Sequence, residues 1–150
     1  MLFFDGEPMG LLWFFFWFLN VFWEMAHSSN NIWVHMVFCT KYRADIISPE
    51  LEIKLYQEIR HQFVKLGCRV LNINGYTDHV HVLFLQSPEH SIREIARRVK
   101  GGSSHAIKRN EQLSPYFSWA TGYYTNSVSE QHLDTIIRYI DKQKEHHAGR

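Results

Sequence analysis

The sequence has few of the residues that stabilise small secreted domains or build extended fibrous chains. Its 150 residues include two cysteines, four prolines and eight glycines. Cys39 and Cys68 lie far apart and form no C-x-x-C pair, so neither a disulfide framework nor a thiolate zinc site is predicted. The low proline and glycine content excludes collagen-like repeats and Pro/Gly-rich disorder. These absences favour a folded domain in a reducing cytoplasm.

The first 24 residues contain no lysine or arginine, yet they hold 10 of the 23 aromatic residues. Their hydrophobic run, 11–23, has 13 residues, whereas a membrane-spanning helix needs about 20. A secretory signal is not indicated either, because acidic residues precede the run and no small-residue cleavage site follows it. We therefore expect residues 1–24 to be an aromatic-rich extension, residues 25–150 to form the domain, and the protein to have no membrane partner.

The remaining residues, 25–150, have a different composition from the chain average. They carry 16 basic and 12 acidic side chains, a net charge of +4, whereas the whole chain has +1. All ten histidines also lie in this part. The domain is therefore mildly basic and rich in potential metal ligands.

The patterns of hydrophobic and turn residues predict an element order of β-α-β-β-α-β-α. Serines at the starts of hydrophobic repeats indicate three helix caps, and two glycines predict a weakened or bent second helix. The expected strands are 32–40, 68–76, 79–86 and 119–127, and the expected helices are 49–66, a second from Ile92 weakened at Gly101-Gly102, and a last one capped by Ser129. The order predicts an α+β fold of the ferredoxin-like or RRM-like split βαβ type. It has a four-stranded antiparallel sheet, helices on one face and a further C-terminal helix.

Two histidines on a predicted strand are candidate metal ligands. His79 and His81 are two residues apart, so both side chains leave the same face of the sheet, which we expect to be the open one. Paired imidazoles on a rigid strand can chelate one ion, although two ligands do not complete a site. The alternative is that they are two polar residues on an exposed sheet face.

The predicted last helix offers further polar residues beside this pair. Tyr139 and Gln143 are separated by four residues and share one helix face, and His146 and His147 follow on roughly the same stripe. This stripe flanks the hydrophobic residues expected to face the core. The alternative is that Tyr139 is an aromatic residue at the edge of the core and that Gln143 is an amide exposed to solvent.

The predicted second helix is strongly basic. Six cations stand against one acid, Glu94, within 17 residues. Such a stripe is typical of surfaces that bind phosphate backbones, although it also suits a solvated charged face. Aromatic residues elsewhere are candidates for stacking on unpaired bases: Tyr42, Trp119, Tyr123 and Tyr124. The candidate DNA-binding cations are Arg93, Arg97, Arg98, Lys100, Lys108 and Arg109.

Taken together, four segments resemble a known family over about residues 28–147. They are VHMVFCTKYR, the His79-Val80-His81 element within GYTDHVHVLF, FSWATGYYTNSVS, and YIDKQKEHH. The chain resembles the HUH-type single-tyrosine transposases of small bacterial insertion sequences. This is the IS200-like transposase family, including relatives associated with repetitive extragenic palindromes. Several ordered motifs at family-like spacing are more specific than any one of them.

The resemblance implies metal-assisted cleavage and rejoining of single-stranded DNA. Tyr139 would be the catalytic nucleophile and form a 5′-phosphotyrosine intermediate. His79, His81 and Gln143 would be ligands of a divalent metal, Mg²⁺ or Mn²⁺. The implied partners are single-stranded DNA with hairpin ends and a second copy of the chain, in a homodimer whose tyrosine helix is supplied in trans.

Two alternatives to this function are open from the sequence. The same fold and basic helix suit a catalytically degenerate or domesticated module that binds single-stranded nucleic acid without cutting it. A metal-dependent hydrolase would instead use the two strand histidines, a C-terminal histidine and an activated water.

Overall fold

The computed structural model describes residues 30–109 and 114–148. By its internal contacts the chain divides into Met1–Asn30 and Asn31–Arg150, and the second unit contains the elements given below. The expectation that residues 1–24 are an extension falls outside the described residues and stays a prediction. Among the described residues, no helix is long and apolar enough to cross a membrane.

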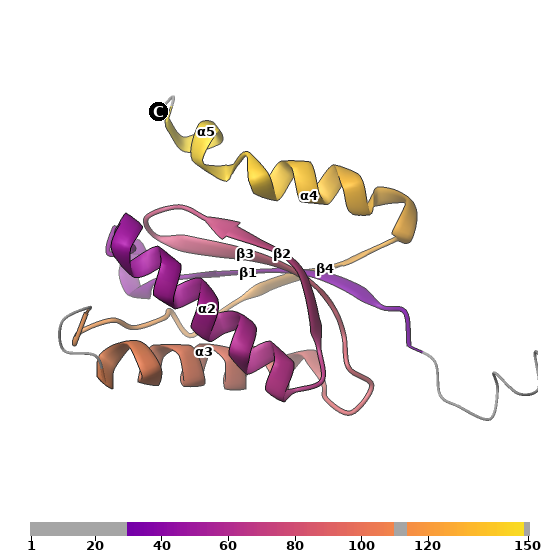
Figure 1. Ribbon diagram of the computed structural model, residues 1–150, viewed down its shortest axis with the longest axis horizontal. Coiled ribbons are helices and arrows are strands. Elements are labelled where there is room, and N and C mark those ends of the chain that lie inside the picture. The colour runs from indigo at the N-terminus through magenta and orange to yellow at the C-terminus, as the bar shows by residue number, and fades with distance from the viewer. Residues whose placement is uncertain (1–29, 110–113, 149–150) are drawn as a thin grey trace, which may run out of the picture. The chain divides into compact units, whose positions relative to one another are not determined.

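Four antiparallel strands form one sheet in the order β2-β3-β1-β4. The strands are β1 (Trp33–Cys39), β2 (Arg69–Gly75), β3 (His79–Leu85) and β4 (Tyr124–Val128). The helices are α2 (Pro49–Lys65), α3 (Ile92–Arg109), α4 (Leu133–Asp141) and α5 (Gln143–Ala148), with short 3-10 turns η1 (Lys41–Arg43) and η2 (Glu130–His132). Helices α2 and α3 lie on one side of the sheet and α4 and α5 on the other (Figure 1). The predicted fold class is confirmed.

Helix starts follow the capping signals in the sequence. The Ser48 hydroxyl accepts a hydrogen bond from the Leu51 amide at 3.3 Å, and Pro49 occupies the first turn, where its missing N–H costs nothing. Ser91 accepts from the Glu94 amide at 3.2 Å in the same way at the start of α3. Both caps fix where the hydrophobic stripes of α2 and α3 begin.

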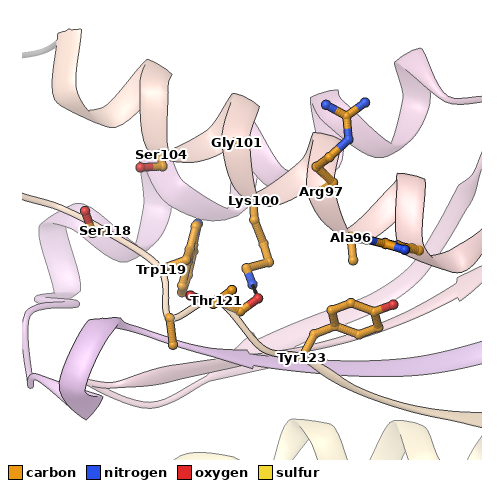
Figure 2. A pocket seen from close by; sticks show the side chains of 11 residues that line it. Ala96, Arg97, Lys100, Gly101, Ser104, Ser118, Trp119, Thr121 and Tyr123 are labelled. Carbon is orange, nitrogen blue, oxygen red and sulfur yellow. Dashed lines mark hydrogen bonds between the residues drawn. The ribbon is translucent and has the colours of Figure 1, made fainter.

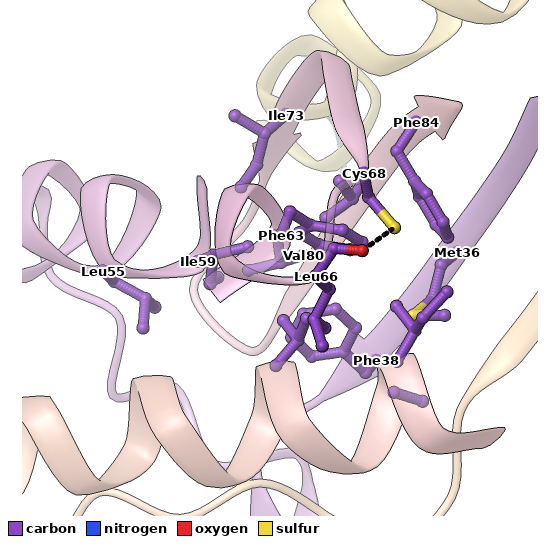
Figure 3. Packing of buried hydrophobic residues seen from close by; sticks show 14 of the residues in the cluster. Met36, Phe38, Leu55, Ile59, Phe63, Leu66, Cys68, Ile73, Val80 and Phe84 are labelled. Atoms are coloured by element: carbon purple, nitrogen blue, oxygen red, sulfur yellow. Dashed lines mark hydrogen bonds between the residues drawn. The ribbon is translucent and has the colours of Figure 1, made fainter. Parts of the chain in front are cut away.

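The alternation of side chains along each strand divides the sheet into two apolar layers. Val80, Val82 and Phe84 of β3 face α2 and α3 and join the large core. Figure 3 shows Ile59, Phe63 and Phe84 among the packed side chains of this core. On the opposite face, a second cluster is built from Trp33, Leu83, Val128 and Ile140, with Leu85, Leu133, Ile136 and Ile137 packed against it. The second cluster holds α4 on the sheet.

Helix α3 runs unbroken through Gly101 and Gly102, and the predicted weakening at this pair stays a prediction. Gly102 packs against α2, where an added Cβ would lie 2.4 Å from the Gln62 side chain. Three other local predictions were wrong. Trp119 makes only an isolated bridge to Thr40, so the strand begins at Tyr124. The last helix is divided at Lys142 into α4 and α5. Ser129 does not cap it, because Ser129 precedes η2 and its hydroxyl lies 2.7 Å from Nδ1 of His132, the N-cap residue of α4.

Candidate functional site

The histidine pair lies on the sheet face that α4 and α5 cover. His79 and His81 are 5% and 6% exposed. Their rings lie 5.1 Å apart, centroid to centroid, at an interplanar angle of 72°. The expectation of an open face was wrong. The strands carry a second apolar cluster on this face, and the apolar side of α4 packs against it and covers the histidines. The alternative of two exposed polar residues is excluded by the same burial.

A carboxylate orients His79. Oδ1 of Asp78 lies 2.5 Å from Nδ1 of His79, and Oδ2 of Asp78 pairs with the Arg43 guanidinium at 2.7 Å. A carboxylate can only accept, so Nδ1 of His79 carries the proton and Nε2 keeps its lone pair. Hydrogen bonds of this kind commonly fix the ring orientation of metal-binding histidines.

A third imidazole contacts His81. Nε2 of His35, on β1, lies 2.9 Å from Nδ1 of His81, and the two rings are stacked with centroids 5.1 Å apart. Burial, followed by the charges of His35, His79 and His147, lowers the pKa of His81 to about 3. Burial also lowers the pKa of His35. A neutral imidazole is the form that can bind a metal.

Tyr139 lies beside this group of histidines. Its ring is 5.6 Å from that of His81 and 6.1 Å from that of His35, both edge-on. The side chain is 44% exposed, so the phenol is accessible from solvent while its ring contacts the buried pair. His146 of α5 flanks the tyrosine with a centroid distance of 5.8 Å. The structure thus brings together the strand histidines and the helix tyrosine that the sequence predicted.

Gln143 begins α5, directly after the break that follows α4. It is 2% exposed, and its Nε2 donates to the carbonyl oxygen of Tyr139 at 3.0 Å. Because Nε2 is the donor in this hydrogen bond, Oε1 is the amide atom that is able to bind a cation. The alternative of a solvated amide is excluded by the burial.

Two asparagines of β2 anchor the end of α4. Asn74 Nδ2 donates to the Ile140 carbonyl at 2.9 Å, and Asn72 Nδ2 donates to the Asp141 carboxylate at 2.9 Å. They satisfy a backbone acceptor in the last turn of the helix, where no intrahelical donor is available. These residues help to place Tyr139 and Gln143, and the sequence analysis did not identify them.

A cavity of about 570 Å³ opens beside the tyrosine and is mainly apolar in its lining. Its walls come from β1, from the segment before β4 and from α4. Residues of the histidine group and several tyrosines contribute, among them His35, His81, Tyr123, Tyr124 and Tyr139. The cavity gives a substrate of nucleotide size a route to the phenol.

The three predicted metal ligands are two imidazoles and one amide. Their available donor atoms are Nε2 of His79, Nε2 of His81 and Oε1 of Gln143, because the other nitrogens are in the contacts described above. Among the described residues, no group of three or more His, Cys, Asp and Glu side chains is arranged to hold a metal ion. Two nitrogens and an oxygen suit Mn²⁺ better than Mg²⁺, which prefers oxygen ligands.

The basic helix α3 lies on the opposite side of the sheet from this site (Figure 1). A cavity of about 400 Å³ separates α3 from the segment before β4 and includes Arg93, Arg97, Trp119 and Tyr123 in its lining. Figure 2 shows Lys100 reaching across this cavity, where its Nζ donates to the carbonyl oxygens of Thr121 and Gly122 at 2.8 Å each. Lys100 thus holds this segment in place.

The other predicted cations of α3 have different surroundings. Arg98 pairs with Glu94 at 3.6 Å, and together with Arg97 it borders a second cavity of about 420 Å³ against the end of α2. Lys108 and Arg109 are exposed in the last turn. The six cations therefore form a surface that the catalytic candidates do not share.

The family model described as "Transposase IS200 like" matches residues 28–143. The chain is 27% identical over 114 residues to the ISDra2 transposase TnpA of Deinococcus radiodurans, covering 73% of this chain and 81% of that protein. It is 26% identical over 132 residues to the transposase for insertion sequence element IS200 of Salmonella typhimurium, covering 81% and 83%.

Two solved structures share the fold. One is a protein of Deinococcus radiodurans described as a transposase, with a TM-score of 0.62, 25% identity and coverage of 77% of this chain and 93% of that one. The other is a REP-associated tyrosine transposase bound to a REP hairpin, with a TM-score of 0.59 and coverage of 81% and 70%. At 12% identity, the second likeness concerns the fold alone.

Proposed function

The chain belongs to the IS200-like transposase family, whose model matches residues 28–143, and from this premise we propose that it cleaves and rejoins single-stranded DNA through Tyr139. The observation that carries the proposal is the position of the Tyr139 ring, 5.6 Å from the buried ring of His81. A protein that only binds nucleic acid has no need for a tyrosine whose ring contacts a pair of buried histidines.

The reaction needs only one bond exchange at phosphorus. The Tyr139 phenol gives its proton to solvent, and its oxygen attacks the phosphate in line. The Oη–P bond forms as the P–O3′ bond breaks, and the departing 3′ oxygen takes a proton. The products are a 5′-phosphotyrosine and a free 3′-OH. Attack by a 3′-OH from another strand reverses these steps, so joining needs no ATP.

The residues around the tyrosine have separable roles. Free phenols lose their proton near pH 10, so the step needs a nearby positive charge. A bound Mg²⁺ or Mn²⁺ supplies that charge to the phenolate and to the phosphate oxygens. His79, His81 and Gln143 would hold the ion, while Asp78 keeps Nε2 of His79 available. The burial of both histidines excludes competing water from their rings.

The proposed substrate is single-stranded DNA with hairpin ends. The fold neighbour described as bound to a REP hairpin supports a structured DNA end as the ligand. The cations of α3, including Arg93 and Arg97, would hold its phosphates, and Trp119 and Tyr123 line the same cavity. Such binding should weaken steeply with salt.

We further propose that the protein acts as a homodimer whose tyrosine helix works in trans. In a single chain α4 packs on its own sheet through Leu133, Ile136, Ile137 and Ile140. An exchanged α4 would form the same contacts on the partner subunit, so the apolar surface of the sheet serves either arrangement.

Incubation with single-stranded hairpin DNA from the element's ends and Mn²⁺ or Mg²⁺, followed by a denaturing gel, tests the proposed cleavage. We expect wild type to form a covalent protein–DNA adduct and Tyr139→Phe to form none while still binding the DNA. Tyr76→Phe, which removes the hydroxyl of another tyrosine near the histidines, is the matched control and should keep the adduct.

The other outcomes separate the alternatives. Cleaved product without an adduct would support the hydrolase. Its C-terminal histidine would be His147, whose ring lies 5.0 Å from that of His79, although no group of three His, Cys, Asp or Glu side chains in the described part of the chain is arranged to hold a metal ion. Tight binding with neither product nor adduct would support the binding module. An equal adduct from Tyr139→Phe would show that another residue is the nucleophile.

A further inference from the structure

His35 is a buried polar residue in the middle of β1 that the proposed reaction does not yet use. It is 8% exposed and lies opposite Leu83 of β3 and Asn126 of β4 in the sheet. His81 lies opposite Val37, so the two histidines are diagonal neighbours on one face of adjacent strands. Their ring planes differ by 18°, and their facing nitrogens are 2.9 Å apart.

A hydrogen bond between two imidazoles requires one donor and one acceptor. If His35 donates to Nδ1 of His81, then His81 carries its own proton on Nε2 and has no lone pair left for a cation. If His81 donates from Nδ1, its Nε2 lone pair is free. The position of the proton shared by the two rings therefore decides whether Nε2 of His81 can bind a cation.

The neighbouring histidine indicates which arrangement the site uses. Nδ1 of His79 faces the Asp78 carboxylate, which can only accept, so His79 presents Nε2. The two strand histidines present equivalent nitrogens only if His81 also donates from Nδ1. In that arrangement His35 takes the place that Asp78 has beside His79, without adding a buried negative charge.

We propose that His35 is a positioning residue, which accepts the Nδ1–H of His81 through its own unprotonated Nε2 and so holds Nε2 of His81 ready to bind a divalent cation. His35 then carries its own proton on Nδ1. The inference rests on the proposed function for the identity of the ion, whereas the contact between His35 and His81 is formed by the chain's own residues.

Nitrogen-15 NMR of the metal-free wild type at about pH 8, where an unperturbed imidazole is neutral, tests the proton positions directly. Protonated and unprotonated ring nitrogens have well-separated chemical shifts, and loss of signals in His81→Gln identifies the His81 ring. We expect His81 to be protonated on Nδ1 and His35 to be unprotonated on Nε2. A His81 ring protonated on Nε2 would overturn the proposal.

Two variants then test the consequence for metal binding. His35→Phe keeps a planar ring but removes the acceptor, and we expect Mn²⁺ affinity, measured by electron paramagnetic resonance without DNA, to fall about 10- to 100-fold. His35→Gln offers a carbonyl oxygen near the place of Nε2 and should restore most of the affinity. Equal affinity in wild type and folded His35→Phe would also overturn the proposal.

These results are independent of the outcome for the tyrosine chemistry. If wild type binds no Mn²⁺ or forms no DNA adduct, the proposed function fails, while the NMR experiment still reports whether His35 accepts from His81. If wild type forms the adduct but His81 is protonated on Nε2, the proposed function stands and the role of His35 is wrong. Thermal unfolding of each variant separates loss of the ligand from loss of the fold.

Discussion

His81 shows how burial among like groups changes the chemistry of a single residue. In the folded chain its pKa is lowered to about 3, first by burial and then by His35, His79 and His147. A histidine in the unfolded chain has a pKa near 6.5. Between pH 6.5 and pH 3, His81 is therefore mainly neutral in the native state and mainly protonated in the unfolded state, so the free energy of unfolding depends on pH.

We predict that the free energy of unfolding of the metal-free protein falls as the pH drops below about 6.5 towards 3. The stabilisation is complete above the unfolded pKa and is lost as the pH falls towards the folded one. One such group contributes a slope approaching about 1.4 kcal/mol per pH unit, or about 2 kcal/mol between pH 6.5 and pH 5. Urea unfolding at several pH values measures the slope.

His81→Gln is the control for this pH dependence, because glutamine does not titrate. Its unfolding free energy should change less than that of wild type over the same range. The other histidines contribute to both proteins, so the difference between the two slopes is the informative quantity. Identical slopes would mean that His81 is protonated as easily in the native state as in the unfolded one.

The position of some site residues could be predicted from the sequence, whereas the position of others could not. Alternation along β3 was enough to place His79 and His81 on one face, since the side-chain period of a strand is two. The contact of His35 with His81 depends on the register between β1 and β3, which pairs Val37 with His81. Register arises from packing of the whole sheet, so no local signal could have revealed His35.

Among the elements, the β2–β3 hairpin carries the strongest local constraint. Gly75 ends β2, and a Cβ there would lie 2.1 Å from the carbonyl oxygen of His79. The contact is with backbone, which cannot rotate away as a long side chain can. The hairpin that carries His79 therefore requires glycine at this position.

We predict that Gly75→Ala destabilises the protein by more than about 2 kcal/mol, because the hairpin must separate to admit the methyl group. Chemical denaturation measures the loss, and adduct formation should fall with it. Gly101→Ala is the matched control. It lies in α3 with nothing within 4 Å of its added Cβ, so it should stabilise the fold by up to about 1 kcal/mol.

Unchanged stability in Gly75→Ala would mean that the turn after β2 can move without disturbing the histidines. A large loss in Gly101→Ala would mean that α3 is strained at its glycine pair. The two results together test whether glycine is needed for space at one site and is merely tolerated at the other.

The elements at the C-terminal end were predicted less well than those before them. The apolar stripe of α4 was visible at helical spacing, and its residues do pack on the sheet. The division at Lys142 was not, because it depends on tertiary contacts that hold the end of α4, such as the bond from Asn74 to the Ile140 carbonyl. Such contacts override local helix propensity.

At the scale of the whole molecule, the basic helix α3 and the group of histidines with Tyr139 lie on opposite sides of the sheet. Helix α3 packs with α2 on one face, and α4 carries Tyr139 on the other (Figure 1). A DNA strand that contacts both must pass around an edge of the sheet. The 570 Å³ cavity beside Tyr139 and the 400 Å³ cavity beside α3 both include Ala120 and Tyr123, which marks the segment before β4 as that edge.

We predict that mixed dimers of Tyr139→Phe and His81→Gln chains form a covalent DNA adduct, although neither variant does so alone. In trans, the intact tyrosine of one chain meets the intact histidines of the other, giving one complete site in each mixed dimer. Random mixing should yield about a quarter of the wild-type adduct, since half of the dimers are mixed. Denaturing gels with chains of different mass identify which chain carries the DNA.

A mixture without adduct would show that each site uses its own tyrosine, which is the arrangement seen within the single chain. Sedimentation of the wild type supplies the control for assembly. A monomer that still forms the adduct would remove the need for exchange altogether.

The sequence by itself determined the order of the main helices and strands, the two faces of each strand and the apolar stripe of α4, because these follow from periodicities of two and 3.6 residues along one segment. Only the tertiary structure decided that α4 covers the histidine face and that His35 and Asp78 contact the two imidazoles. It also decided that the basic helix lies on the far side. These relations join segments distant in the chain, and they arise when apolar surfaces on both faces of the sheet are buried together.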